Sequence, residues 1–274
     1  MSSHLIETSY YTEGPVIDQQ GVIFVTNLLG QQVLRVEDCQ STMEWAACSS
    51  PNGQFIASNG DHYICNSLKG SIERYDARGV YLGTFFEGSV DGYPVSCPND
   101  LWIGEEGLFF TDSIRHTGAV VFIASNGMVK LIARDLDYPN GIVYDKKRNC
   151  LYVAESYKNR IIKINLSSTK QPISCLVNLP AHPSGEMTKN LPDGLCLEDE
   201  DMLWIAHYGM GKVHCYDLKR EALHSYESGI TLTSNIFVNQ DTIVITGGEG
   251  EPGPGRIRII DRKKHAEFKK LSSL

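Results

Sequence analysis

The chain has 274 residues, 42% of them hydrophobic and 21% charged, which is enough for one domain with a substantial core. It has 25 Lys and Arg against 33 Asp and Glu, a formal net charge of −8, and no basic cluster of the kind that binds nucleic acid. No run approaches the roughly 20 consecutive apolar residues that span a bilayer, and residues 1–4 lack the basic and apolar regions of a signal peptide. We therefore expect a single cytoplasmic domain over residues 1–274, with no nucleic-acid or membrane partner.

The eight cysteines form no CxxC pair and no metal-type spacing with the eight histidines. An even number of cysteines is compatible with disulfides. Without a secretion signal, reduced thiols in core positions are the better interpretation.

Short apolar stretches separated by Gly, Asn and Asp predict β-strands throughout the chain. In chain order, clear examples are residues 4–8, 107–112, 151–156, 160–164, 203–206, 212–217 and 256–260. No segment keeps a helical apolar period for three turns. These observations predict an all-β fold.

The strands belong to a module that recurs six times. Each copy is predicted to begin with a turn that carries Pro or Gly beside Asn, Asp or Glu, as in Pro139-Asn140-Gly141. The polar residues that open the copies are, in chain order, Glu13, Asn52, Asn99, Asn140, Asp193 and Asn235.

These residues are 39, 47, 41, 53 and 42 positions apart, and a period of about 40 to 50 residues is typical of a β-propeller blade. A sandwich or jelly roll also has many short strands, but it does not repeat one motif ahead of each unit. We therefore predict a six-bladed β-propeller with four antiparallel strands per blade. Residues 4–8 are expected to close the ring as the outer partner of residues 256–260.

If the six copies begin at the same structural place, their opening side chains meet at one end of the central channel. Asn and Asp are ordinary turn formers, and that explanation is sufficient for any single copy. Glu is a poor turn former, however, so the two carboxylates among the six side chains favour an oxygen-rich site for a divalent metal.

Two other segments were considered as sites. The acidic run at residues 198–201 is expected to be a solvated turn, because consecutive carboxylates cannot all face one ion. The glycine-rich run at residues 247–255 lacks the Lys-Ser/Thr pair of a phosphate loop.

The ordered motifs resemble those of the SMP-30/gluconolactonase/LRE-like family, and the resemblance extends from about Glu13 to Asp261. The motifs that carry it are Glu13-Gly14-Pro15, Pro98-Asn99-Asp100, Pro139-Asn140-Gly141, the run at residues 154–160, Pro192-Asp193-Gly194 and Leu203-Trp204-Ile205-Ala206. The resemblance implies a six-bladed propeller with one divalent metal, and for many members the hydrolysis of sugar lactones.

The resemblance also implies roles for individual residues. Glu13, Asn140 and Asp193 correspond to the metal ligands, with Ca²⁺ as the expected ion and Zn²⁺, Mg²⁺ or Mn²⁺ as alternatives. Asp193 is also the expected general base, and Asn99 the amide that contacts substrate. Asn52, another member of the ring of polar side chains, is a further candidate for contact with the substrate. In this mechanism the metal polarises the lactone carbonyl while Asp193 takes a proton from the attacking water.

Sugar-lactone members commonly carry an arginine shortly before the residue equivalent to Asn99, whereas residues 94–98 here contain no cation. Arg115 and His116 are the candidates to replace it, with a solvated loop as the alternative. His207 is a further candidate for contact with the substrate, with a structural role as its alternative. The long interval before Asp193 places an insertion at residues 182–190, which is either a lid or a passive loop.

Three functions remain open from the sequence. The first is a metal-dependent hydrolase of a small lactone. The second is another reaction at the same site, such as organophosphate hydrolysis or metabolite rearrangement, and the third is a propeller that binds a partner without catalysis.

Overall fold

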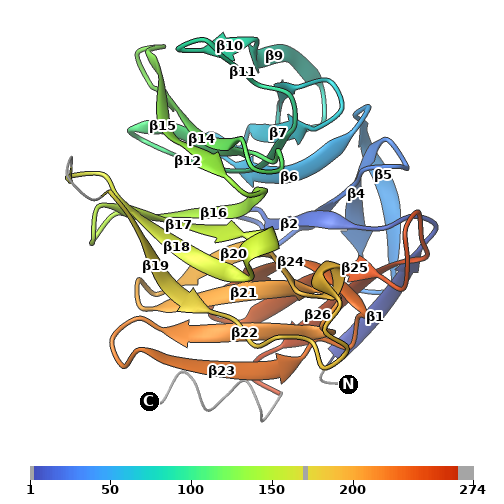
Figure 1. The fold of residues 1–274 in the computed structure, drawn as a ribbon. Helices are drawn as coiled ribbons and strands as arrows, with labels where there is room; N and C mark the ends of the chain where they lie inside the picture. Colours follow the sequence, from blue (N-terminus) through green and yellow to red (C-terminus); the bar gives the residue numbers. More distant parts are fainter. Residues whose placement is uncertain (1–2, 169–171, 265–274) are drawn as a thin grey trace.

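The computed structural model describes residues 3–168 and 172–264, and within these ranges six four-stranded antiparallel sheets surround a central channel (Figure 1). The prediction of a six-bladed β-propeller is confirmed. Each blade is named here by its order around the ring, and its first strand lies innermost.

The first three blades follow one another along the chain. Blade one consists of β2 (Glu13–Ile17), β3 (Ile23–Asn27), β4 (Gln32–Glu37) and β5 (Ser41–Ala47). Blade two consists of β6 (Pro51–Ile56), β7 (His62–Asn66), β8 (Ser71–Tyr75) and β9 (Tyr81–Glu87). Blade three consists of β12 (Pro98–Gly104), β13 (Gly107–Asp112), β14 (Gly118–Ala124) and β15 (Val129–Leu136).

The next two blades repeat this order, and four short elements lie outside the blades. Blade four consists of β16 (Pro139–Asp145), β17 (Cys150–Glu155), β18 (Arg160–Asn165) and β19 (Ile173–Asn178). Blade five consists of β20 (Leu191–Glu198), β21 (Met202–Tyr208), β22 (Lys212–Asp217) and β23 (Ala222–Glu227). The additional elements are the ribbon of β10 (Ser89–Val90) and β11 (Tyr93–Pro94), and the 3₁₀ turns η1 (Ser156–Lys158) and η2 (Met187–Lys189).

The sixth blade joins the two ends of the chain. Its strands, from the channel outward, are β24 (Leu232–Val238), β25 (Thr242–Gly248), β26 (Gly255–Asp261) and β1 (Ser3–Thr8). Ile6 stands opposite Ile257, and Glu7 opposite Arg256, in antiparallel register. The predicted closure of the ring by the N-terminal strand is therefore confirmed.

The hydrophobic core is divided into six layers, one between each pair of neighbouring blades. The layer between blades five and six contains the fully buried Trp204 together with Ile236 and Ile245. A blade therefore buries both of its faces against its neighbours, which explains why the strands have apolar residues on both sides. All eight cysteines are free thiols, as expected. Only four of them are buried, Cys48, Cys65, Cys150 and Cys215, so the expectation of core positions holds for half of them.

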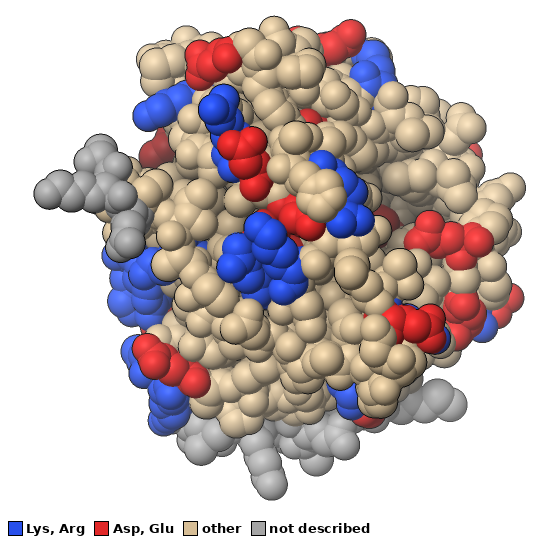
Figure 2. All heavy atoms as spheres, in the orientation of Figure 1, with Lys and Arg blue, Asp and Glu red and all other residues tan. Residues whose placement is uncertain are grey.

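The surface carries charges of both signs. On the face drawn in Figure 2, Lys and Arg side chains are interspersed with Asp and Glu around the middle of the molecule. Among the described residues, no helix has both the length and the apolar character needed to span a membrane.

Candidate functional site

The recurring motif lies inside the first strand of each blade, at a β-bulge. In β16, Pro139 pairs with Glu155 and Ile142 pairs with Val153, so two residues on the inner strand oppose one on its partner. The inner strands β6, β12 and β20 have the same irregularity at the same place. The prediction that the motif forms a turn ahead of the strand is therefore wrong. A bulge bends the strand and changes the direction of a side chain, here that of Asn140.

The glycine of the motif is required by the close approach of neighbouring blades. A Cβ atom on Gly141 would lie 2.3 Å from the backbone oxygen of Asp193, and one on Gly53 would lie 2.6 Å from the backbone oxygen of Asn99. Both distances are shorter than any ordinary contact. Glycine after the polar residue thus allows adjacent inner strands to converge at the channel.

Serine hydroxyls fix the start of the next inner strand in three blades. The Oγ of Ser67 donates to the backbone oxygen of Pro98 at 2.7 Å, and the Oγ of Ser156 donates to that of Pro192 at 2.7 Å. Ser113 makes the same bond to Pro139 at 2.5 Å. These bonds cross from one blade to the next and hold the motif residues in place around the channel.

A cavity of about 550 Å³ opens where the inner strands begin. Five of the predicted site residues line it together: Glu13, Asn52, Asn99, Asn140 and Asp193. The rest of its wall is made largely of tyrosine and leucine: Tyr11, Leu28, Leu29, Tyr138, Ser156, Tyr157, Thr188, Lys189, Leu191, Tyr208, Leu232 and Glu251.

The sixth copy of the motif departs from the other five. In β24, Thr233 pairs with Gly247 and Ile236 with Ile245, so Ser234 occupies the position that Asn140 has in β16. Asn235 takes the place of the motif glycine and lines a separate cavity of about 410 Å³ further along the inner strands. The expectation that Asn235 joins the ring of polar side chains is therefore wrong, because the register of the motif is shifted by one residue in this blade.

Burial dominates the electrostatics of the two carboxyl groups in the cavity. Desolvation, with further contributions from the charges of Asp100 and Glu251, raises the pKa of Glu13 to about 8. The pKa of Asp193 is also raised, first by desolvation and then by the charge of Glu13. A hydrogen bond from the Asn140 side chain to Asp193 opposes that rise. Burial therefore favours the protonated form of both carboxyl groups when no cation is beside them.

Asp100 adds a third buried carboxyl group that the sequence analysis did not single out. It follows Asn99 and takes the position of the motif glycine, as Asn235 does in blade six. Its oxygens accept hydrogen bonds from the backbone N–H of Leu101 at 2.9 Å and of Ile142 at 3.2 Å. Burial raises the pKa of Asp100 to about 7. Asp100 therefore connects two inner strands directly beneath the site.

The donor set at the site suits a hard divalent cation. Within the described ranges, no three Asp, Glu, His or Cys side chains are grouped to hold a metal ion. A metal site here must therefore combine the carboxylates of Glu13 and Asp193 with an amide oxygen, and Asn140 lines the same cavity. Two buried, mutually repelling carboxyl groups beside an amide are chemically matched to a cation that prefers oxygen ligands.

Arg115 and His116 lie beside the cavity, and neither is part of its wall. The Nε of Arg115 bonds to Asp137 at 2.7 Å, and its guanidinium lies 3.5 Å from the ring centre of Tyr157, which does line the cavity. The backbone N–H of His116 also bonds to Asp137, and its side chain is mostly exposed. Arg115 thus reaches the site only through Tyr157.

His207 is fully buried and does not line the cavity. Its Nδ1 lies 2.9 Å from Nε2 of His214, whose Nδ1 lies 2.8 Å from the Ser225 hydroxyl. Desolvation, followed by the charge of His214, lowers the pKa of His207 to about 3. This geometry matches the structural alternative considered for His207.

Several residues of the wall were missed by the sequence analysis. Four of them share a position two residues before the motif residue of their blade: Tyr11, Tyr138, Leu191 and Leu232. Side chains two apart on an extended strand face the same side, so this position could have been found from the sequence. Glu251, by contrast, comes from the glycine-rich loop, where it accepts a hydrogen bond from the Tyr208 hydroxyl at 2.8 Å. No periodic signal marks Glu251.

The insertion before Asp193 contributes two residues to the cavity. Thr188 and Lys189, both in η2, lie in its wall. Lys189 is held by an ion pair with Glu186 at 2.9 Å. The loop therefore forms part of the mouth of the site.

The fold and the site together define a six-bladed propeller with an oxygen-rich cavity at the start of its inner strands. The sequence profile of the SMP-30/Gluconolactonase/LRE-like region matches residues 11–248. The chain belongs to this family.

Relatives of this chain are named lactonase or gluconolactonase. The lactonase drp35 of Staphylococcus aureus (strain MW2) is 25% identical over 217 residues, which cover 73% of this chain and 64% of the relative. The chain thus matches less than two thirds of that relative's length.

Two solved structures have the same fold. A gluconolactonase from Xanthomonas campestris superimposes with a TM-score of 0.76 at 21% identity, over 93% of this chain and 87% of the other. A calcium-binding protein, regucalcin, from Agrobacterium tumefaciens superimposes with a TM-score of 0.72 at 17% identity, over 93% and 91% of the two chains.

Proposed function

We propose that this protein is a divalent-metal-dependent lactonase that hydrolyses the cyclic ester of a small molecule. The observation that carries the proposal is the pair of buried carboxyl groups, Glu13 and Asp193, that share a cavity with Asn140. The cavity volume of about 550 Å³ is within the range of small-molecule sites, about 300–1,000 Å³. The names of the family's members, lactonase and gluconolactonase, support the type of reaction.

Glu13, Asn140 and Asp193 are the residues that would hold the ion, and Ca²⁺ is the expected ion, with Zn²⁺, Mg²⁺ or Mn²⁺ as alternatives. The name of one structural neighbour, a calcium-binding protein, agrees with this choice. When bound, such an ion supplies a Lewis acid for the carbonyl and acidifies water. A neighbouring cation also keeps the two carboxylates ionised, which reverses the effect of burial on their pKa values.

Asp193 acts as the general base, taking a proton from the water that attacks the carbonyl carbon. Asn99 and Asn52 lie in the same wall and bind the oxygens of the substrate. The Nδ2 of Asn52 donates to the Ser67 hydroxyl at 3.1 Å, which orients its amide. No nucleophilic side chain is needed in this sequence of steps.

The substrate is a small lactone of a kind still to be determined. Residues 94–98 contain no cation to bind sugar hydroxyls, and tyrosine and leucine form much of the wall. Arg115 touches the site through Tyr157, and Lys189 lies in the wall itself, so these two cations are the candidates to replace the missing arginine.

The proposal is tested by removing metal with a chelator, restoring Ca²⁺, Mg²⁺, Mn²⁺ or Zn²⁺ in turn, and following proton release from a panel of lactones. Activity that returns with metal and is lost in Asp193→Ala supports the proposed function. A metal-dependent rise in melting temperature without turnover of any lactone would replace it with another reaction at the same site, organophosphate hydrolysis or rearrangement of a metabolite. The absence of both effects would leave a propeller that binds a partner without catalysis.

A further inference from the structure

One buried hydroxyl in the wall of the cavity has no hydrogen-bond partner. Tyr11 lines the cavity and is 7% exposed, and its hydroxyl oxygen is buried without a partner among the described residues. Leaving a buried polar group unpaired destabilises the folded state, because the group loses its bond to water and gains none in return. Such a group in a ligand-binding wall indicates that a bound molecule supplies the missing partner.

The ring of Tyr11 is held firmly from several sides. Its backbone N–H donates to the backbone oxygen of Pro252 at 2.9 Å. Its ring packs edge-on against Tyr208, with ring centres 6.3 Å apart. On another side, a Cβ atom on Gly248 would lie only 3.0 Å from the Tyr11 ring. The hydroxyl is therefore positioned by the fold before any ligand binds.

The surroundings of Tyr11 place it at the reacting end of the cavity. The charged groups that act on it are Glu13, Asp193 and Glu251, all of which line the same wall. Its neighbour Tyr208 already donates its hydroxyl proton to Glu251 at 2.8 Å. Tyr11 thus has a free donor in the same wall as the proposed ion ligand Glu13 and the proposed general base Asp193, whereas the hydroxyl proton of Tyr208 is already donated to Glu251.

We infer that Tyr11 contacts the substrate, and that its hydroxyl donates a hydrogen bond to the carbonyl oxygen of the lactone. This inference rests on the proposed lactonase function. As the water oxygen bonds to the carbonyl carbon, the π electrons of the C=O bond move onto the carbonyl oxygen. The ring C–O bond then breaks, and the ring oxygen receives the proton that Asp193 removed from the water, giving a hydroxy acid. A donor fixed in advance stabilises the oxyanion more than the neutral carbonyl.

The test is Tyr11→Phe, which removes only the hydroxyl and keeps the ring that packs on Tyr208. With γ-butyrolactone, δ-valerolactone and glucono-δ-lactone as probes, we expect kcat to fall about 10- to 100-fold and KM to change less than about twofold, because the bond strengthens in the transition state. The melting temperature without substrate should stay the same or rise, because an unpaired buried hydroxyl is removed. Tyr10→Phe is the matched control, since Tyr10 is adjacent and 41% exposed. This variant should retain full activity.

The possible results separate this inference from the proposed function. If the wild type hydrolyses a lactone and Tyr11→Phe matches it in kcat, the inference is wrong and the proposed function stands. A lower melting temperature together with lower kcat would assign the hydroxyl a structural role. Loss of the Ca²⁺-induced rise in melting temperature would assign it to the ion site, which also overturns the inference. If the wild type hydrolyses none of the probes in the presence of metal, the proposed function fails and the inference fails with it.

Discussion

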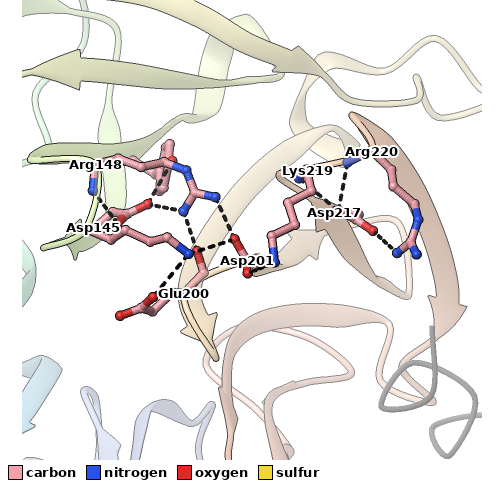
Figure 3. Close-up of polar contacts among 9 residues, drawn as sticks. Asp145, Arg148, Glu200, Asp201, Asp217, Lys219 and Arg220 are labelled. Carbon is pink, nitrogen blue, oxygen red and sulfur yellow. Dashed lines mark hydrogen bonds and ion pairs between the residues drawn. The ribbon is translucent and has the colours of Figure 1, made fainter.

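Two clusters of carboxylates in this propeller have opposite electrostatic character. One is the pair Glu13 and Asp193 in the cavity, whose pKa values are raised first by burial and then by the charges of neighbouring carboxylates. The other is a network at the turns of blades four and five, around Asp145 and Asp201 (Figure 3). Both clusters are rich in carboxylates. They differ because the second cluster also contains basic side chains, Arg148 and Lys219, that pair with its carboxylates.

In the network, every carboxylate has a basic partner. The guanidinium of Arg148 bonds to Asp145 at 2.8 Å and to Asp201 at 2.6 Å, and Lys219 bonds to the other oxygen of Asp201 at 2.6 Å (Figure 3). Hydrogen bonds from Lys219 and Arg148 lower the pKa of Asp201 to about 2. The acidic run at residues 198–201 was expected to be a solvated turn. Residues 199–201 do form a turn, and Asp199 and Glu200 are exposed as predicted. The prediction is wrong for the two ends of the run: Asp201 is paired with bases, and Glu198 is buried and bonded to Trp204 and Arg262.

The cavity has no such compensation. The Glu13 and Asp193 side chains form no salt bridge with Lys, Arg or His within the described part of the chain. Lys189, the nearest base in the wall, is paired with Glu186. The comparison indicates that carboxylates with built-in partners hold two blades together, whereas carboxylates without partners are available to an external cation.

The largest expected difference between the two clusters is in activity. Asp193→Asn should lower kcat by about 10³-fold, because the general base is lost and an ion ligand is weakened. Asp201→Asn is the matched control, since it makes the same chemical change in the paired cluster, and it should retain at least about half of the activity. Steady-state hydrolysis of a lactone substrate measures both. Equal losses in the two variants would show that the distinction between the clusters is wrong.

A second difference concerns stabilisation by metal. Ca²⁺ at 100 times its dissociation constant stabilises the folded state by about 2.7 kcal/mol, which corresponds to roughly 5–10 °C in melting temperature for a chain of this size. We expect this shift in the wild type and in Asp201→Asn, and none in Asp193→Ala. Thermal unfolding of chelator-treated protein, with and without Ca²⁺, provides the measurement. A shift that persists in Asp193→Ala would place the ion elsewhere.

A third difference is the pH dependence of stability without metal. The folded-state pKa of Glu13 is about 8, above its ordinary value of 4.5, so the folded state holds this proton more tightly than the unfolded state does. The stabilising effect of the protonated group is therefore present below about pH 4.5 and is lost as the pH rises toward 8. Glu13→Gln should weaken this dependence, leaving the part that comes from Asp193 and Asp100, and stabilise the metal-free protein by about 1–2 kcal/mol at pH 8.

Urea unfolding in the presence of a chelator at pH 5, 6.5 and 8 measures this effect. The difference between Glu13→Gln and the wild type should grow with pH. If the wild type is instead most stable at pH 8 without metal, the assignment of Glu13 as an uncompensated buried acid is wrong.

The smallest expected effect is the stability of the paired cluster. The pKa of Asp201 is lowered to about 2, so its ion pairs contribute stability above about pH 4, and that contribution is lost as the pH falls through 2. Its side chain is 18% exposed at a surface turn, and we therefore expect Asp201→Asn to cost only about 1 kcal/mol at pH 7. Urea unfolding at pH 7 and pH 3 should show a smaller difference at the lower pH. A larger cost at pH 3 would contradict the assignment.

Much of the site could be predicted from the sequence because it repeats. Glu13, Asn52, Asn99, Asn140 and Asp193 lie at equivalent positions in five blades, and their spacing alone identified both the number of blades and the residues of the cavity. The prediction failed at Asn235, where the motif moves by one residue and Ser234 takes the equivalent place. Register within a strand depends on pairing with its partner, which a short motif does not determine.

The sequence by itself determined the class of fold, the closure of the ring and the residues that repeat from blade to blade, because strand alternation and the bulge motif are local properties of the chain. The tertiary structure alone decided which non-repeating residues reach the cavity. Glu251 and Thr188 come from loops of irregular length, and the fold leaves the hydroxyl of Tyr11 without a partner among the described residues. The packing of six blades around the channel also buries Glu13 and Asp193 in the cavity wall without a salt-bridge partner among the described residues, and this environment gives the two carboxylates their distinct chemistry.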